Sequence, residues 1–298
     1  MAAGDDVVAL SRSAAEPETA GARAVAVDLL DAEATARAVA QAEPEVVYHL
    51  AALASVAGSW EQPGKAMSEN TLATLNLLEA IRTQTPEARV IVVGSGEVYG
   101  HPASLPVEED APLRPQNPYA VSKAAVDLLA AMYVDAHGLE VVRVRAFNHA
   151  GPRQSTDYVV ASLTRQVAAG LAAGENPVRV VTGNPEPRRD FTDVRDVVLA
   201  YRELAASAAP DAYNVCSGRA TSVAELISLL RDVTGHEIAH EVDPARVRAH
   251  DVMEIRGSHD RLTAATGWEP RIPLATTLAD TVAWWREREA ESAQAADG

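Results

Sequence analysis

The sequence predicts an α/β protein with a doubly wound parallel sheet and a smaller, mixed α/β lobe in its C-terminal part. Two observations support this prediction. Short apolar runs alternate with helical segments through the first half of the chain, which is typical of parallel strands buried on both faces. In the second half the strand-like and helix-like segments follow one another less regularly, which indicates a second lobe.

The first half begins with strand-like runs at 7–10 and 24–27, and an Ala-rich helix follows at 32–42. A buried strand is expected at 45–50. A long helix is expected at 67–83, because leucine and isoleucine recur every three residues along it. The remaining elements of this half are a strand at 90–93, a helix at 120–136 and a valine-rich strand at 140–146.

The second half is expected to begin with a helix at 158–173 and a short strand at 178–181. Ser222, with Glu225 three residues later, has the form of a capping box and predicts the start of a helix that ends near Thr234. The other expected elements are helices at 196–206 and 277–288 and a strand at 213–215.

These elements predict two domains. The first comprises 1–150, with 188–208 crossing back to it, and the second comprises 151–187 and 209–288. The last residues, 289–298, are expected to form a frayed tail.

Composition and charge exclude several classes of protein. The 298 residues carry a net charge of −16, which argues against nonspecific binding to nucleic acid or to an acidic membrane. The single cysteine, Cys216, excludes an intrachain disulfide and a cysteine metal cluster. His49 and His149 have no partners at metal-ligand spacing, so no metal site is expected. No signal peptide and no apolar run of membrane-spanning length is evident, so we expect a cytoplasmic protein.

The strongest chemical signal combines Ser95, which follows a buried strand, with Tyr119 and Lys123 on the next helix. A helix places residues four apart on one face. An ammonium beside a phenol stabilises the phenolate, and such a phenol can exchange a proton with a sugar hydroxyl or ketone while a nicotinamide exchanges hydride. Ser95 would then give a second hydrogen bond to the same oxygen. The Tyr-x-x-x-Lys spacing alone is common, and its place after the serine makes the signal specific.

The start of the chain lacks a feature that a dinucleotide-binding fold normally has, namely a strand, a glycine-rich turn and a helix that holds the pyrophosphate. Gly4 is instead expected to end a helix, directly before the strand-like run at 7–10. We therefore expect that about 20–25 residues, one strand and one helix, are missing from such a unit. Either the true start lies upstream of Met1 or the chain is truncated.

Several motifs together resemble the extended short-chain dehydrogenase/reductase family, which contains nucleotide-sugar epimerases, dehydratases and reductases. Apart from Ser95 and the Tyr119/Lys123 pair, the resemblance rests on segments spread along nearly the whole chain. These are 49–52 (HLAA), Asn70 with 74–80 (TLNLLEA), 147–152 (FNHAGP), 189–194 (RDFTDV) and 213–215 (YNV). Further details, at 54–60, 188–201, 214–219 and 265–270, most resemble GDP-4-keto-6-deoxy-mannose reductases, with GDP-mannose 4,6-dehydratases as a sister group.

The resemblance implies a Rossmann-like dinucleotide-binding domain in the first part and a nucleotide-sugar lobe in the second. It implies NADP(H) as cofactor, with NAD possible. Arg12 follows the strand-like run at 7–10, which corresponds to the second strand of such a fold, and a cation there favours the 2′-phosphate of NADP. Asp28 and Leu29 resemble the pair that meets the adenine ring. The remaining cofactor-binding residues that it implies are Leu50, Ala51, Ala52, Tyr119 and Lys123.

On the substrate side the resemblance implies a GDP-linked hexose. Asn148, Arg189 and Arg248 are the expected binding residues, since arginine guanidinium groups match phosphate oxygens. Arg248 precedes Asp251 as a family arginine precedes an Asp, although the residues between them, Ala249 and His250, depart from the usual Pro and small polar residue. A homodimer is also expected.

Three functions remain open from the sequence. The first is NADP(H)-dependent reduction of the C4 ketone of GDP-4-keto-6-deoxy-D-mannose to GDP-D-rhamnose, with Ser95, Tyr119 and Lys123 as catalytic residues. The second is a GDP-mannose 4,6-dehydratase, in which Glu97 would remove a proton from C5; the reductases also tend to keep this Glu, so its presence does not decide. The third is a non-catalytic homologue that binds nucleotide sugars.

Overall fold

The computed structural model describes residues 4–13, 21–247 and 252–297, with side chains as far as Glu291. The chain divides into two compact units. The first contains 1–98, 115–145 and 204–212, and the second contains 99–114, 146–203 and 213–298. The segment 99–114 and most of 188–208 thus group with the second unit, which is larger than we expected. Which function each predicted domain serves stays a prediction.

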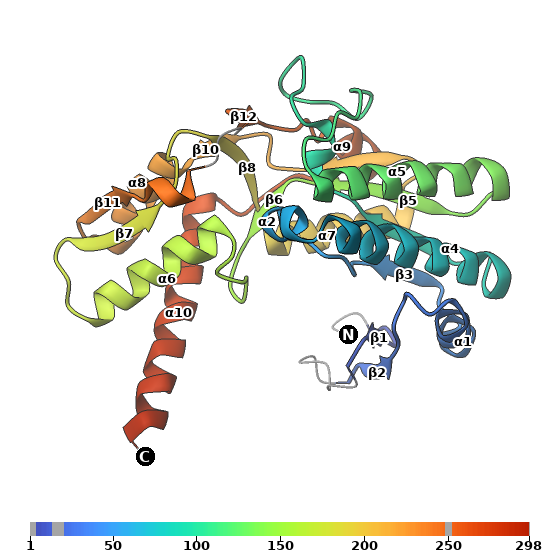
Figure 1. Cartoon of the computed structure of the whole chain (residues 1–298), viewed down its shortest axis with the longest axis horizontal. Helices are drawn as coiled ribbons and strands as arrows, with labels where there is room; N and C mark the ends of the chain where they lie inside the picture. Colours follow the sequence, from blue (N-terminus) through green and yellow to red (C-terminus); the bar gives the residue numbers. More distant parts are fainter. Residues whose placement is uncertain (1–3, 14–20, 248–251, 298) are drawn as a thin grey trace. The chain divides into compact units, whose positions relative to one another are not determined.

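The strands of the first unit form two parallel groups, as the apolar runs predicted (Figure 1). One group is the pair β1 (Val8–Ser11) and β2 (Arg23–Ala26). The other is the sheet β3-β4-β5-β9, to which the first unit gives β3 (Val46–His49), β4 (Arg89–Val93) and nearly all of β5 (Val141–Ala146). Its last strand, β9 (Ala212–Val215), groups mostly with the second unit. Among the described residues, no strand pairs with both β1 and β3.

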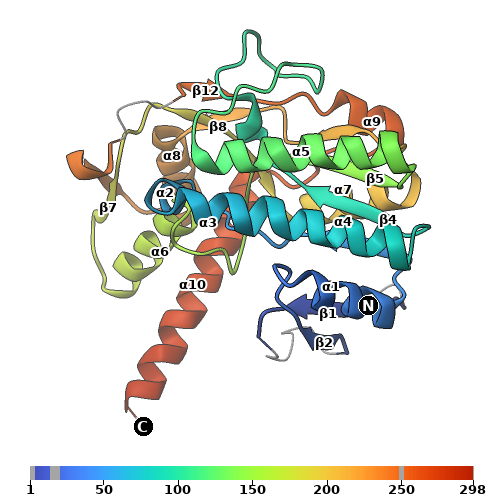
Figure 2. The same cartoon turned by 45° about the vertical axis from the view of Figure 1, so that its right-hand side comes forward.

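Two long helices of this unit, α4 (Ala73–Gln84) and α5 (Pro118–His137), lie side by side (Figures 1 and 2). Their apolar faces pack with β4 and β5 in one buried cluster, to which α4 gives Leu77, Leu78 and Ile81, the strands give Val90, Val92 and Val141, and α5 gives Val126, Ala130 and Tyr133. The predicted helix α1 (Ala32–Ala42) begins at an Asp31 N-cap.

The helix expected at 67–83 is interrupted. A short helix α3 (Pro63–Met67) leads into a π-helical turn, η1 (Ser68–Leu72), and only then into α4. Two further short helices of this unit, α2 (Val56–Glu61) and the 3₁₀ turn η2 (Gly96–Tyr99), were not predicted. Such turns are too short to leave a periodic pattern.

The second unit combines a mixed sheet, a parallel strand pair and several helices. The sheet has the order β10-β8-β12, with β6 also paired to β8, and the pair is β11-β7. Its strands are β6 (Asn148–Ala150), β7 (Val178–Thr182), β8 (Arg188–Asp193), β10 (Ala220–Ser222), β11 (Ile238–Val242) and β12 (Glu254–Ile255). Its helices are α6 (Val159–Ala172), α7 (Val194–Ser207, whose end lies in the first unit), α8 (Val223–Thr234), the 3₁₀ turn η3 (Pro244–Arg246), α9 (Asp260–Thr266) and α10 (Leu274–Asp297).

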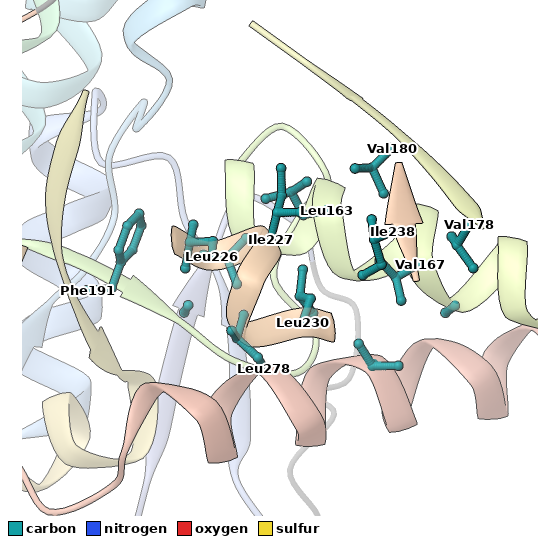
Figure 3. Packing of buried hydrophobic residues seen from close by; sticks show 14 residues of the cluster. Leu163, Val167, Val178, Val180, Phe191, Leu226, Ile227, Leu230, Ile238 and Leu278 are labelled. Atoms are coloured by element: carbon teal, nitrogen blue, oxygen red, sulfur yellow. The ribbon is translucent and has the colours of Figure 1, made fainter. Parts of the chain in front are cut away.

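The core of this unit lies between α6, α8, α10 and the strands (Figure 3). Leu163 and Val167 of α6 meet Leu226, Ile227 and Leu230 of α8, Leu278 of α10 and Val178, Val180, Phe191 and Ile238 of the strands. The predicted capping box is confirmed, because Ser222 Oγ accepts from the Glu225 amide and the Glu225 carboxylate accepts from the Ser222 amide.

The polar run at 188–193, for which no element was predicted, is a strand, β8, although it has no apolar pattern. Helix α10 continues through 289–297, where a frayed tail was expected, to Asp297. The helix expected before Gly4 lies outside the described residues.

Candidate active site

Helix α5 presents the Tyr-x-x-x-Lys pair at its first two turns. Asn117 is the N-cap and accepts a hydrogen bond from the amide of Ala120, and Pro118 occupies the first helical position, where a missing N–H costs nothing. Tyr119 and Lys123 therefore lie one turn apart on the same face, as the sequence predicted, and both are buried.

Lys123 reaches from α5 to the end of β4. Its ammonium Nζ donates to the carbonyl oxygen of Val93 at 2.7 Å, two residues before Ser95. Burial lowers the pKa of the Lys123 ammonium to about 8. A cation that has lost most of its water interacts strongly with nearby polar groups, as a proton-transfer site requires.

Ser95 follows β4 at a place where the backbone is packed tightly. The amide of Gly94 donates to the Val144 carbonyl at 2.6 Å, and a Cβ at Gly94 would lie 2.7 Å from that same oxygen. Only glycine allows β4 to lie this close to β5 just before the serine. Ser95 is 7% exposed, and its Oγ accepts from the amide of Glu97 at 3.2 Å.

Glu97 lies near the start of α5. Its carboxylate accepts a hydrogen bond from the Asn117 side-chain amide at 3.3 Å and is half-buried. Because Asn117 caps α5, the carboxylate lies near the positive end of the helix dipole, where a negative charge is stabilised. The first unit thus brings all four predicted catalytic residues, Ser95, Glu97, Tyr119 and Lys123, to the end of β4 and the start of α5.

His49, at the end of β3, is a buried neighbour of this site. Its Nε2 lies 2.9 Å from Thr74 Oγ1. The pKa of His49 is lowered to about 4, mainly because the ring is buried and to a lesser extent because of the nearby charge of Lys123. His49 is therefore neutral at pH 7 and adds no second positive charge beside Lys123.

The residues predicted to hold a cofactor also belong to the first unit, and several are accessible. Leu50, after β3, is 61% exposed. Arg12, after β1, is exposed and pairs weakly with Glu69 at 3.4 Å. Asp28 lies two residues after β2, and its carboxylate accepts a hydrogen bond from the Leu30 amide at 3.0 Å. The other three follow the same strand ends: Ala51 is exposed, and Leu29 and Ala52 are half-buried.

The predicted substrate residues lie in the second unit. Asn148 is exposed on β6, beside Phe191 of β8. The Arg189 guanidinium donates to the carbonyls of Arg188 at 3.0 Å and Val252 at 2.7 Å, so part of it braces the backbone. Arg248 and Asp251 lie outside the described residues. The substrate-binding roles of Asn148 and Arg189 stay predictions.

Three polar residues near Tyr119 were not assigned a role from the sequence. Ser59 on α2 and Ser122 on α5 are fully buried, and Asn70 in the π-helical turn is nearly so. All three make hydrogen bonds to α5 or within it. Buried polar side chains outside a core pattern are the signal that could have revealed them, but burial itself depends on the fold.

Two further searches of the described ranges bear on function. None of the helices there is both long enough and apolar enough to cross a lipid bilayer. No set of three or more His, Cys, Asp or Glu side chains within these ranges is placed to hold a metal ion.

The sequence and the fold are similar to those of known nucleotide-sugar enzymes. The GDP-6-deoxy-D-mannose reductase of Pseudomonas aeruginosa is 39% identical over 248 residues, covering 82% of this chain and 81% of that protein. The UDP-glucose 4-epimerase of Mycolicibacterium smegmatis is 31% identical over 265 residues, covering 89% of this chain and 83% of that protein.

Solved structures give the same result. RMD from Pseudomonas aeruginosa, complexed with NADPH, has a TM-score of 0.81 and 34% identity, with 91% of each chain covered. The Thermotoga maritima UDP-glucose 4-epimerase with UDP-glucose has a TM-score of 0.86 and 27% identity, covering 97% of this chain and 93% of that one.

The family model for GDP-mannose 4,6 dehydratase matches residues 6–281, which is nearly the whole chain. Together with the relatives above, this match confirms the resemblance that the sequence motifs indicated. The chain belongs to the GDP-mannose 4,6-dehydratase family, within the epimerase/dehydratase branch of the short-chain dehydrogenases/reductases.

Proposed function

We propose that this chain is an NADP(H)-dependent reductase that converts the C4 ketone of GDP-4-keto-6-deoxy-D-mannose to the alcohol of GDP-D-rhamnose. The observation that carries the reaction type is the buried Lys123, held at the end of β4 one helical turn from Tyr119. The substrate is supported by the 39% identity to a GDP-6-deoxy-D-mannose reductase, with 81% of that protein covered.

The nicotinamide part of NADP(H) would lie at the buried Tyr119 and Lys123, and the rest of the cofactor would follow the accessible residues after β1, β2 and β3, which belong to the same unit. Arg12 would bind the 2′-phosphate once its ion pair with Glu69 is broken. That ion pair is weak, because the Arg12 side chain is 72% exposed. Leu50, Ala51 and Ala52 would line the cofactor path beyond β3. The bound cofactor supplies the hydride that C4 receives.

The side chains of this chain handle the proton. Tyr119 donates its phenolic proton to the C4 oxygen as that oxygen gains negative charge. Ser95 donates a second hydrogen bond to the same oxygen and stabilises the charge. Lys123 holds its positive charge near the phenol and favours the phenolate that remains. Because His49 is neutral, it adds no second positive charge beside Lys123.

A second function, GDP-mannose 4,6-dehydratase, is supported by Glu97. Its carboxylate is held by Asn117 close to the start of α5, where it could accept a proton from C5 of the sugar. The family model also carries the dehydratase description.

Substrate tests separate these functions. We expect the full chain to oxidise NADPH when it is given GDP-4-keto-6-deoxy-D-mannose, with a C4 alcohol as the product by NMR. A dehydratase would instead convert GDP-mannose to the 4-keto-6-deoxy sugar without net consumption of cofactor. Neither reaction, together with stabilisation by GDP-mannose in a thermal shift assay, would indicate a non-catalytic homologue. Stronger stabilisation by UDP-glucose than by GDP-mannose would point to a hexose epimerase.

We also infer that the chain pairs with a second copy through α5. Val121, Leu128 and Met132 are 43%, 62% and 44% exposed, and their spacing of seven and four residues places them on one face of this helix. An exposed apolar stripe of this kind marks an interaction surface. A symmetric dimer would bury it against itself.

A further inference from the structure

The backbone of Tyr119 is held on both sides by serine hydroxyls. The amide N–H of Tyr119 donates to Ser59 Oγ at 3.1 Å, and the carbonyl of Tyr119 accepts from Ser122 Oγ at 2.7 Å. Both serines are completely buried. Ser59 belongs to α2, sixty residues earlier in the chain, and Figures 1 and 2 both show α2 beside the N-terminal end of α5.

The bond from Ser59 completes the first turn of α5. The first four N–H groups of a helix have no partner within it and must find one elsewhere. At the start of α5, Pro118 has no N–H, Ala120 is satisfied by the Asn117 side chain, and Val121 donates to the Asn117 carbonyl. Tyr119 is the position left over, and a side chain from another helix, Ser59, provides its acceptor.

The hydroxyl of Ser59 is itself fixed in direction. It donates to the carbonyl of Val56, one turn earlier in α2, at 2.7 Å, while it accepts from Tyr119. A hydroxyl can do both at once, and neither an alanine nor a thiol can replace it fully. The side chain thus links the backbone of α2 to the backbone of the residue that bears the phenol.

The second serine is fixed in the same way. Ser122 Oγ accepts from the Asn70 side chain at 2.8 Å while it donates to the Tyr119 carbonyl. Asn70 also exchanges hydrogen bonds with the backbone of Leu53, at 2.7 and 3.2 Å, and it lies in the π-helical turn. Turns of this kind occur often at functional sites.

We propose that Ser59 is a positioning residue for the proton transfer, and that its hydroxyl holds the Tyr119 backbone where the phenol can meet the substrate oxygen. This inference rests on the proposed function for its catalytic consequence, but the bond itself can be tested without catalysis. Small displacements of a reacting group can cost on the order of 10²-fold in rate. The Tyr119 phenol lies at the end of a long side chain, so a shift of its backbone moves the phenol directly.

The test compares Ser59→Ala with a matched control, Ser55→Ala. Ser55 is the N-cap of the same short helix, and its Oγ accepts from the Gly58 amide at 3.0 Å. Each variant removes one serine hydroxyl bond within α2, from Gly58 to Ser55 or from Ser59 to Val56. Ser59→Ala removes the bond from Tyr119 as well, so it should lower the unfolding temperature more.

For the full chain with NADPH and GDP-4-keto-6-deoxy-D-mannose, we expect Ser59→Ala to lower kcat about 10- to 100-fold with KM for the sugar within two-fold of the parent. Ser55→Ala should keep kcat within two-fold. In hydrogen exchange followed by NMR, the Tyr119 amide should lose at least ten-fold of its protection in Ser59→Ala and should keep it in Ser55→Ala.

Equal kcat values for the two variants would overturn the proposal, as would unchanged protection of the Tyr119 amide in Ser59→Ala. A rise in KM with unchanged kcat would also contradict it, since that pattern indicates lost ground-state binding. If the parent chain reduces no sugar nucleotide, the proposed function fails. The exchange experiment then decides alone whether Ser59 holds the Tyr119 backbone.

Discussion

The Asp127 carboxylate accepts two hydrogen bonds from the Arg145 guanidinium, at 2.8 Å to Nε and 3.0 Å to Nη2. Both side chains are buried, with 2% and 6% of their surfaces exposed. Asp127 lies one turn after Lys123 on α5, and Arg145 lies on β5. This bidentate pair therefore fixes the helix that bears the candidate catalytic residues against the sheet beneath it.

Removal of this carboxylate should strongly destabilise the protein. In Asp127→Ala the buried Arg145 guanidinium loses both bonds to the carboxylate, and Arg143, which also donates to Asp127 at 3.0 Å, loses a bond as well. We expect a loss of about 3–5 kcal/mol in the free energy of unfolding, measured by urea denaturation. Arg37→Ala, which removes an exposed pair with Glu33, is the control and should cost under about 1 kcal/mol. Similar losses of unfolding free energy in both variants would show that the buried Asp127–Arg145 pair stabilises the protein no more than the exposed pair does.

Loss of the phenol should stop proton transfer without unfolding the site. Tyr119→Phe keeps the ring and leaves the backbone bonds to Ser59 and Ser122 in place. We expect turnover to fall by about 10²–10⁴-fold, as is typical for a lost general acid. The unfolding temperature should change little, and steady-state kinetics with NADPH would measure the effect. Turnover at the level of the parent chain would exclude Tyr119 as the proton donor.

Acid should destabilise the protein partly through His49. The pKa of His49 is about 4 in the folded chain, well below its ordinary value near 6.5, so the unfolded chain binds the proton more readily. The stability that neutral His49 provides is complete above pH 6.5 and is lost as the pH falls toward 4. The full difference corresponds to about 3 kcal/mol.

Carboxylates titrate in the same pH range, so a comparison is needed to isolate this effect. His49→Gln offers Thr74 a side-chain amide and carries no titrating group. We expect the free energy of unfolding, measured by urea at pH 7 and pH 4.5, to fall further in the parent chain than in this variant. Parallel pH profiles of the two proteins would show that His49 is not buried as the structure has it.

The apolar stripe on α5 should control association. A carboxylate at Leu128 would meet its own copy across a symmetric interface and repel it. We expect Leu128→Glu to shift the protein from dimer to monomer in analytical ultracentrifugation. Arg37→Glu, on α1 and 63% exposed, also introduces a carboxylate but lies outside α5, and it serves as the control. A parent chain that is monomeric at micromolar concentration would refute the inference.

The features that could be predicted from the sequence are those that depend on neighbouring residues. The bounds of α1 agree with the prediction, and the capping box at Ser222 and the Tyr119/Lys123 pair on α5 are present, because helix hydrogen bonds and caps join residues three or four apart. The strands β3, β4 and β5 were also predicted from their apolar runs. The expected burial holds for β4 and β5 and is wrong for β3, because Val46 and Tyr48 are exposed.

The tertiary structure alone decided the features that join distant residues. The polar strand β8 exists because its neighbours pair with it, and its Asp190 side chain accepts hydrogen bonds from Ser217, Gly218 and Gly257. The acceptor for the Tyr119 amide is Ser59, sixty positions away, and no local pattern can indicate which hydroxyl the fold will bring to a helix end. Such contacts follow from chain topology, so their residues show no periodicity in the sequence.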